Sequence, residues 1–209
     1  MFTRNILVIL FALLTFFACI GEDSRQMHEA LMQAKAQNEN FEPFTTDSTM
    51  LRVVDYYDAH CTANEQMLAH YLLGCVYRDL GDAPRALECY HDAVSKADTT
   101  DADCDFQRLS RIYGQMADLF YKQKIMRNAI DFWFKASKYS YKSGETFNYI
   151  IFYEHTASAY YLMNKYDSAL VICKNSMNLF KEHGYIKESY DAMPTFIMIL
   201  IKQDRLQEA

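Results

Sequence analysis

The sequence predicts an all-α protein made of stacked antiparallel helix hairpins. Its 209 residues include 6 Gly and 3 Pro, too few for a turn-rich chain or an all-β fold. Hydrophobic residues make up 51% of the chain, which is enough for a sizeable core. Alanines recur at Ala86, Ala129 and Ala169, at intervals of 43 and 40 residues. Repetition of that length is typical of a helical repeat array.

One segment carries the clearest copy of the repeat. Leu73, Gly74 and Tyr77 have the spacing L-G-x2-Y, and the pair Ala86 and Tyr90 has the spacing A-x3-aromatic. This pattern resembles the tetratricopeptide repeat (TPR), whose two helices read W-x2-L-G-x2-Y and A-x3-F. The resemblance implies a TPR-like right-handed α-solenoid, in which each hairpin buries its apolar face against the next.

Two further copies follow in the same order. Small residues at facing positions let the two helices of a hairpin approach closely, and large rings fill the space between hairpins. In the first copy, Gly81 is expected to end the first helix in the left-handed conformation, and Pro84 to lie in the first turn of the second. The second copy comprises Tyr113, Met116, Ala117, Phe120, Ala129, Trp133 and Ala136, and the third comprises Tyr153, Ala157, Tyr160, Ala169, Cys173 and Ser176.

The spacing of about 40 residues exceeds the usual 34, so the helices are predicted to be long, over 103–123 and 145–164. An earlier helix is predicted through Tyr56 and Tyr57, because residues 47–50 align with the start of a second helix in the third copy.

A fourth repeat is expected to begin its second helix at 204–209, with Ala209 in the place of the repeated alanine. That position leaves the last hairpin incomplete. Core residues that a further repeat would cover, Phe196, Leu200 and Leu206, are therefore expected to be exposed.

Residues 1–18 are predicted to be an export signal, because thirteen uncharged apolar residues follow a single positive charge. The junction Ala18–Cys19 resembles a bacterial lipoprotein signal, which implies lipidation of Cys19. An ordinary cleaved signal with an incidental cysteine is the alternative. The pair Glu22 and Asp23 resembles the acidic export signal of surface lipoproteins. The expected location is the cell envelope, on the periplasmic or surface side, with membrane attachment through this lipid anchor.

The rest of the chain divides into a mature N-terminal segment with a first helix, 19–44, and a repeat domain, 45–209. Segments 54–60 and 70–86 resemble the N-terminal portion of TPR lipoproteins of the Bacteroides type. The resemblance implies a non-catalytic scaffold that binds a protein or peptide. Two alternatives remain: the extracytoplasmic sensory part of a larger regulator, and a glycan-binding outer-membrane lipoprotein.

Charge and motifs argue against other functions. The net charge of -6 disfavours nucleic acid as the partner of this segment. The six histidines and six cysteines have no metal-ligand spacing, and no phosphate-binding or nucleophile motif is present, so no cofactor, metal or catalytic residue is expected. Asp101, Asp103 and Asp105 are interpreted as a solvated cap before a helix rather than a cation site.

The resemblance also implies which residues face a partner. In this family the first helix of each repeat lines a concave groove, at repeat positions 2, 5, 9, 12 and 13. Tyrosines there serve as rigid anchors, and charged residues pair with the ends or side chains of a peptide. The predicted groove residues are Tyr71, Arg78, Arg111, Asp118, Tyr121, Lys122, Glu154 and Tyr161.

Overall fold

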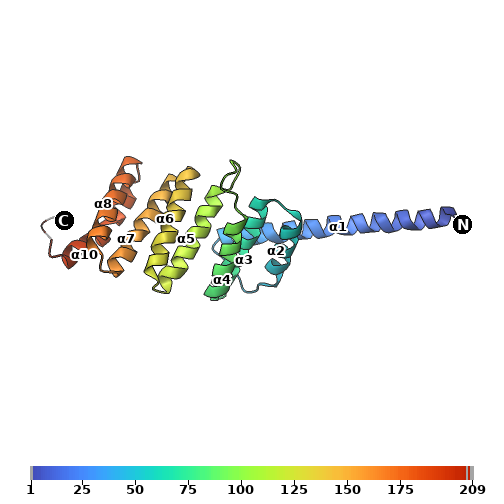
Figure 1. Cartoon of the computed structure of the whole chain (residues 1–209), viewed down its shortest axis with the longest axis horizontal. Coiled ribbons are helices and arrows are strands. Elements are labelled where there is room, and N and C mark those ends of the chain that lie inside the picture. Colours follow the sequence, from blue (N-terminus) through green and yellow to red (C-terminus); the bar gives the residue numbers. More distant parts are fainter. Residues whose placement is uncertain (1, 206, 208–209) are drawn as a thin grey trace. The chain divides into compact units, whose positions relative to one another are not determined.

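The computed structural model describes the backbone of residues 2–205 and 207, and the side chains of residues 21–205 and 207. The described residues form helices and no strand, which confirms the all-α class (Figure 1). The helices are α1 (Phe2–Glu39), α2 (Ser48–His60), α3 (Ala63–Asp79), α4 (Ala83–Lys96), α5 (Phe106–Lys122), α6 (Met126–Lys142), α7 (Thr146–Leu162), α8 (Tyr166–Glu182), α9 (Ile186–Asp191) and α10 (Met193–Lys202).

The chain folds as two compact units. Unit 1 is Met1–Cys89 and unit 2 is Tyr90–Ala209, so the boundary falls inside α4. Each unit has its own buried residues and is described by itself.

Unit 2 has a strict repeat. Helices α5 to α8 are each 17 residues long, and α5 to α9 begin 20 residues apart. The short connections that follow α5, α6, α7 and α8 each contain one residue with positive φ, which ends the preceding helix. The 40-residue hairpin is thus two equal halves, and consecutive helices pack against each other. The positive-φ residues are Lys124, Gly144, Asn164, Gly184 and Asp204.

The repeated small residues lie where the helices meet. Ala117, Ala129, Ala157 and Ala169 are fully buried. Trp133 packs with Ala117 and Ala129 and is 3% exposed. The predicted packing role of these positions is confirmed. The helices are slightly shorter than predicted, because Asp105 caps α5 by accepting a hydrogen bond from the backbone N–H of Arg108 at 2.9 Å.

The expected exposure of Phe196 and Leu200 is wrong. Their side chains are 8% and 0% exposed, because this face of α10 packs on α8 and α7 within one apolar cluster. The remaining prediction, Leu206, lies outside the described residues, as does Ala209. Pro194 lies in the first turn of α10, where its missing N–H removes no helical hydrogen bond.

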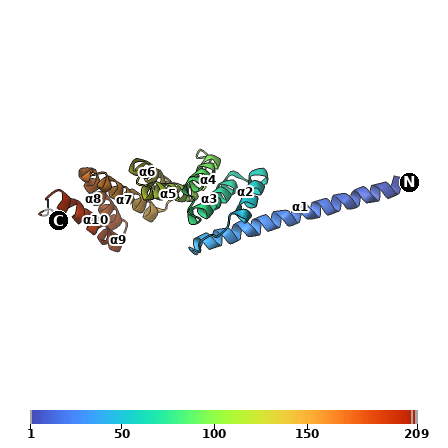
Figure 2. The ribbon, with the colours of Figure 1, turned by 90° about the horizontal axis from the view of Figure 1, so that it is seen from below.

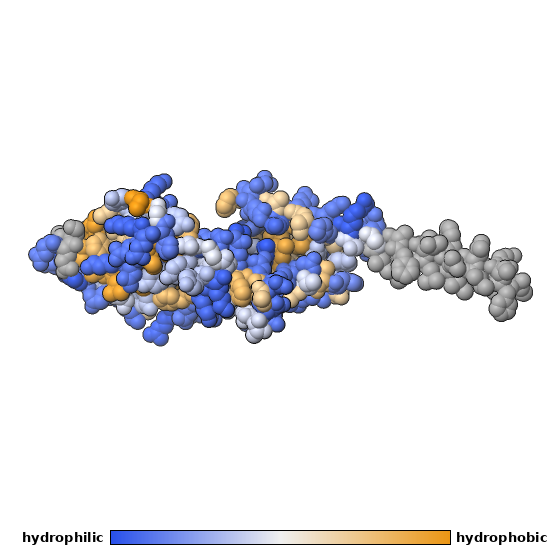
Figure 3. Space-filling model, turned by 90° about the horizontal axis from the view of Figure 1, so that it is seen from above, coloured by the Kyte–Doolittle hydropathy of each residue, from blue (hydrophilic) through white to orange (hydrophobic). Residues whose placement is uncertain are grey.

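A different apolar face is exposed at this end of unit 2, where hydrophobic residues reach the surface (Figure 3). Tyr190, Met198 and Ile201 are 59%, 46% and 54% exposed. Met198 and Ile201 lie on the side of α10 opposite Phe196 and Leu200, so the rotation of α10 about its axis decides which of its apolar side chains are exposed.

Unit 1 begins with α1, whose C-terminal half packs on α2 and α3 (Figure 2). Met27, Leu31 and Ala34 recur at helical spacing and are buried there. The predicted helix through Tyr56 and Tyr57 is confirmed as α2.

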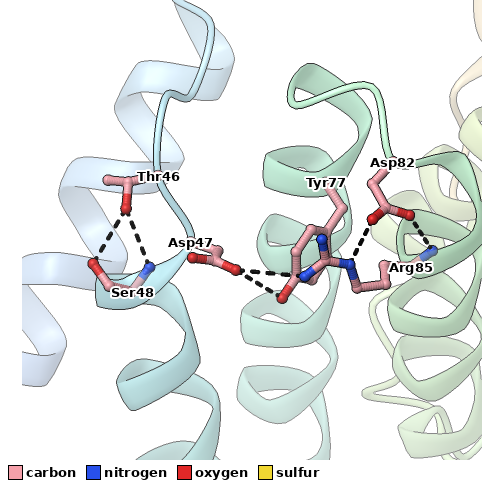
Figure 4. Close-up of polar contacts among 6 residues, drawn as sticks. All are labelled: Thr46, Asp47, Ser48, Tyr77, Asp82 and Arg85. Carbon is pink, nitrogen blue, oxygen red and sulfur yellow. Dashed lines mark hydrogen bonds and ion pairs between the residues drawn. The ribbon is translucent and has the colours of Figure 1, made fainter.

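Polar contacts also join α3 to the start of α2 and to the start of α4 in unit 1 (Figure 4). The hydroxyl of Tyr77 donates to Asp47 Oδ2 at 3.1 Å, which ties α3 to the start of α2. The guanidinium of Arg85 lies 4.4 Å from the centre of the Tyr77 ring and pairs with Asp82 at 2.6 Å. Gly81 has a φ of +78°, which confirms the predicted left-handed end of α3.

The described part of the chain contains no helix that is long and apolar enough to cross a membrane. Helix α1 runs through the predicted junction at Ala18–Cys19, and the side chains before Gly21 lie outside the described residues. The export signal and the lipidation of Cys19 stay predictions.

Candidate peptide-binding face

The first helix of each TPR-like hairpin carries the predicted groove residues, and in unit 1 that helix is α3. Its groove positions are covered by α1. Leu68 and Tyr71 are 8% and 5% exposed, and Cys75 is fully buried. The hydroxyl of Tyr71 is hydrogen-bonded to Asn38 of α1, and burial raises its pKa far above the ordinary value. Tyr71 is therefore part of the contact between α1 and α3 rather than an open anchor.

Arg78 takes part in the same contact. Its Nε donates to Asp79 Oδ1 at 2.8 Å, and a terminal nitrogen approaches Asn38 Oδ1 at 3.4 Å. Asp79 also accepts from the backbone N–H of Phe44 at 3.1 Å, which fixes the segment after α1. Arg78 thus joins three elements of unit 1 and has little freedom to meet a partner.

In unit 2 the predicted groove residues lie on α5 and α7, and two of them are exposed. The side chains of Arg111 and Lys122 are exposed, without an ion pair or hydrogen bond to another described residue. Asp118 and Tyr121 are half-buried next to them. We call this set the α5–α7 face, made of Arg111, Asp118, Tyr121, Lys122, Glu154 and Tyr161.

The buried Trp133 of α6 contacts two residues of this face, Asp118 and Tyr121. Its Nε1 donates to Asp118 Oδ1 at 3.0 Å, and its ring centre lies 5.2 Å from that of Tyr121. On the other side, the ring of His155 meets Trp133 edge to face at 5.3 Å. One buried indole thereby fixes two predicted partner-facing residues, Asp118 and Tyr121.

His155 was not predicted. Its Nδ1 is buried without a hydrogen-bond partner among the described residues, and its ring also lies edge to face against Phe152 at 6.4 Å. Phe152 in turn packs on Gly114, where an added Cβ would lie 2.6 Å from the ring. The sequence signal for His155 was its place beside the groove position of Glu154.

Glu154 lies on α7, half-buried, with no ion pair or hydrogen bond to another described residue. Burial raises the pKa of its carboxyl, and the neighbouring His155 opposes that rise only in part. The pKa of the buried Cys173 thiol is raised to about 12 by burial, with a contribution from Glu154. A carboxylate in this position is costly unless a positive group pairs with it.

Tyr161 completes the face near the end of α7. Its ring is half-buried and tilted against Tyr166, with 5.7 Å between ring centres. The face therefore combines packed aromatic rings, two exposed cations and the half-buried carboxylate of Glu154. Within the described residues, no group of three or more His, Cys, Asp or Glu side chains is arranged to hold a metal ion.

Solved structures share this fold. BtubC from P. vanneervenii is 12% identical, with a TM-score of 0.59 over 90% of this chain and 86% of that one. A kinesin light chain with nearly identical TPR-like repeats, from P. anserina, is 13% identical, with a TM-score of 0.57 over 88% and 98%. MamA is 13% identical, with a TM-score of 0.54 over 87% and 96%.

By sequence, no family model matches the chain, and no curated protein matches it. The structural similarity shows the fold alone. The chain has a TPR-like α-solenoid fold.

Proposed function

We propose that this protein is a non-catalytic scaffold that binds a protein or peptide partner on the α5–α7 face. The observation that carries the proposal is the contrast between the two units. In unit 1 the groove positions are filled by a helix of the same chain, through Tyr71 and Arg78. In unit 2 two other groove positions of the repeat, at Arg111 and Lys122, carry exposed cations.

Helix α1 covers the groove positions of α3 in the way that a helix of a partner would cover the α5–α7 face. Met27, Leu31 and Ala34 form one apolar stripe that is buried in unit 1. Asn38, one turn further on, supplies the polar contact. Burying an amphipathic helix in a groove is a general mode of peptide recognition. A partner helix of similar pattern, with acidic residues for Arg111 and Lys122, fits the α5–α7 face.

Glu154 supports the same proposal. Its half-buried carboxylate forms no ion pair with another described residue, and the neighbouring His155 offsets the effect of burial only in part, so a positive side chain of the partner would stabilise it. In the free protein, burial of the Glu154 carboxylate costs free energy, and an ion pair with the partner would recover that free energy on binding.

For the setting of this activity we propose the cell envelope, with the chain held to a membrane by a lipid on Cys19. The support is the pattern at the start of the sequence, a short apolar stretch ending at Ala18–Cys19. Mass spectrometry of the mature N-terminus tests this part. An unmodified residue after Ala18 would contradict it.

The partner-binding proposal is tested with peptides selected from a random library on the purified full chain. Because Arg111 and Lys122 are exposed, reversing both charges (Arg111→Glu with Lys122→Glu) should preserve the fold and weaken the selected peptides about ten-fold or more. The matched control reverses two exposed lysines elsewhere in unit 2, Lys181→Glu with Lys187→Glu. Equal affinity of all three proteins would contradict the proposal.

A further inference from the structure

The outer seam between the two helices of the α5–α6 hairpin is filled by a ladder of five stacked rings. Successive ring centres are 5.4–6.0 Å apart, with interplanar angles of 5–23°. Rings of α5 and α6 alternate along the ladder. Its members, in spatial order, are Phe106, Tyr139, Tyr113, Phe132 and Phe120.

Lysines of α6 cover this ladder. The Nζ of Lys135 lies 5.4 Å from the centre of the Tyr113 ring, and that of Lys142 lies 4.8 Å from the centre of the Phe106 ring. Lys138 lies 5.7 Å from the Tyr139 ring. Ammonium groups at these distances are attracted to the faces of the rings. In this hairpin the aromatic seam is closed by cations of the same chain.

The next hairpin, α7–α8, repeats the geometry with different side chains. Its helices have the same lengths and lie 40 residues further on, so each position has a direct counterpart. Tyr153 corresponds to Tyr113 and keeps its ring, but Leu179 stands where the ladder has Tyr139. The three lysines Lys135, Lys138 and Lys142 are replaced by Asn175, Asn178 and Glu182.

The result is a hollow. An open pocket of about 440 Å³ lies between α7 and α8, in the seam that the ladder fills in the preceding hairpin. One amide of Asn175 donates to the hydroxyl of Tyr153 at 3.3 Å and holds that ring at the wall. Tyr149 is braced on its other side by Tyr141, edge to face at 5.5 Å. The pocket is lined by Tyr149, Tyr153, Asn175, Asn178, Leu179 and Glu182.

The chemistry of this lining selects a cation. It contains no positive side chain, one carboxylate at Glu182, two amide carbonyls that accept hydrogen bonds, and two tyrosine rings. The carboxylate of Glu182 and the amide of Asn178 have no partner among the described residues. The same seam in the preceding hairpin already places ammonium groups over rings.

We propose that the α7–α8 pocket binds an arginine or lysine side chain of a partner polypeptide, with its charge over the Tyr149 and Tyr153 rings and against Glu182. The incoming cation takes the place that the α6 lysines hold in the preceding hairpin. The planar guanidinium of arginine, which stacks on rings and pairs with a carboxylate, suits the pocket better than lysine. The lining of this site shares no residue with the α5–α7 face, so the two proposals can be tested separately.

The test is fluorescence anisotropy with a fluorescein-labelled Gly-Arg-Gly-Arg-Gly peptide and its citrulline analogue, titrated with the full chain. Citrulline keeps the shape of arginine without its charge. The arginine peptide should bind about five-fold or more tightly than the citrulline peptide, and Glu182→Gln should remove most of that difference. Asp131→Asn, an exposed carboxylate on α6, should leave it unchanged.

A second variant tests the pocket without changing charge. Leu179→Tyr introduces the ring found at Tyr139, so it should fill the seam and abolish preferential arginine binding while thermal unfolding shows an intact fold. Arg111→Glu with Lys122→Glu should not weaken the arginine peptide, which separates this site from the α5–α7 face. Equal binding of both peptides, or an equal loss with Asp131→Asn, would overturn the proposal and leave only non-specific attraction to an acidic protein.

Discussion

The indole Nε1 of Trp133 donates a hydrogen bond to Asp118 Oδ1 across 3.0 Å, from the core of unit 2 to its α5–α7 face. The indole is 3% exposed, so this bond is shielded from water. Trp133 serves both the packing of the hairpins and the orientation of a surface carboxylate.

The first prediction concerns this bond. Trp133→Phe keeps an aromatic ring in the core but removes the N–H and part of the buried area, so unfolding should cost about 2 kcal/mol less than in the wild type. Urea unfolding followed by far-UV circular dichroism measures the difference. Asp118→Asn keeps an acceptor for the indole and should cost less than Asp118→Ala. Equal costs for those two variants would show that the bond contributes nothing.

Gly114 and Phe152 give the second prediction. Gly114→Ala gains about 1 kcal/mol of helix propensity. The new Cβ would lie 2.6 Å from the Phe152 ring, and overpacking costs about 1–3 kcal/mol. The expected net effect is a loss of about 1 kcal/mol in urea unfolding. Because Phe152→Leu makes room, adding Ala at position 114 to that variant should be stabilising. Stabilisation by Gly114→Ala alone would contradict the close packing.

The third prediction uses the pH dependence of Glu154. Burial raises the pKa of this carboxyl in the folded state above its ordinary value of 4.5. Its contribution to stability is therefore fully present below pH 4.5 and is lost as the pH rises through the raised pKa. Glu154→Gln should raise the Tm relative to the wild type at pH 8, and this gain should disappear at pH 4. A gain of the same size at both pH values would show that ionisation is not the cause.

The connections of unit 2 give the fourth prediction. Lys124 has a φ of +64°, a conformation that costs a side-chain-bearing residue about 1–2 kcal/mol relative to glycine. Lys124→Gly should therefore stabilise the protein by about 0.5–1 kcal/mol in thermal unfolding. Asn164→Gly should gain less, since asparagine tolerates φ values near its +58°. Destabilisation by Lys124→Gly would contradict this turn geometry.

Most of the fold was predictable because the repeat is local. The alanines at Ala129 and Ala169 fix the close contacts of two hairpins, and Gly144 and Gly184 end helices in the left-handed conformation. Both features depend on residue type and spacing within one hairpin. Asn164 shows the same backbone without a glycine, and spacing rather than composition identifies it.

The rest depends on contacts between distant residues. Nothing local to Tyr71 or Arg78 indicates that Asn38, on another helix, occupies their side of α3. Likewise, the sequence does not indicate that Phe196 is buried, because its burial depends on how α10 is rotated about its axis. The sequence predicts which helix carries each candidate residue, while tertiary packing decides which of these side chains are exposed.

Mapping a bound peptide by crosslinking shows directly whether the α5–α7 face binds the partner. A peptide selected on the full chain, carrying a photo-crosslinking residue at each position in turn, is irradiated in the complex and its attachment sites are found by mass spectrometry. We expect attachment within residues 111–122 of α5 and 151–162 of α7. Attachment confined to α6 and α8, or unchanged by Arg111→Glu with Lys122→Glu, would contradict the assignment of the α5–α7 face as the partner-binding surface.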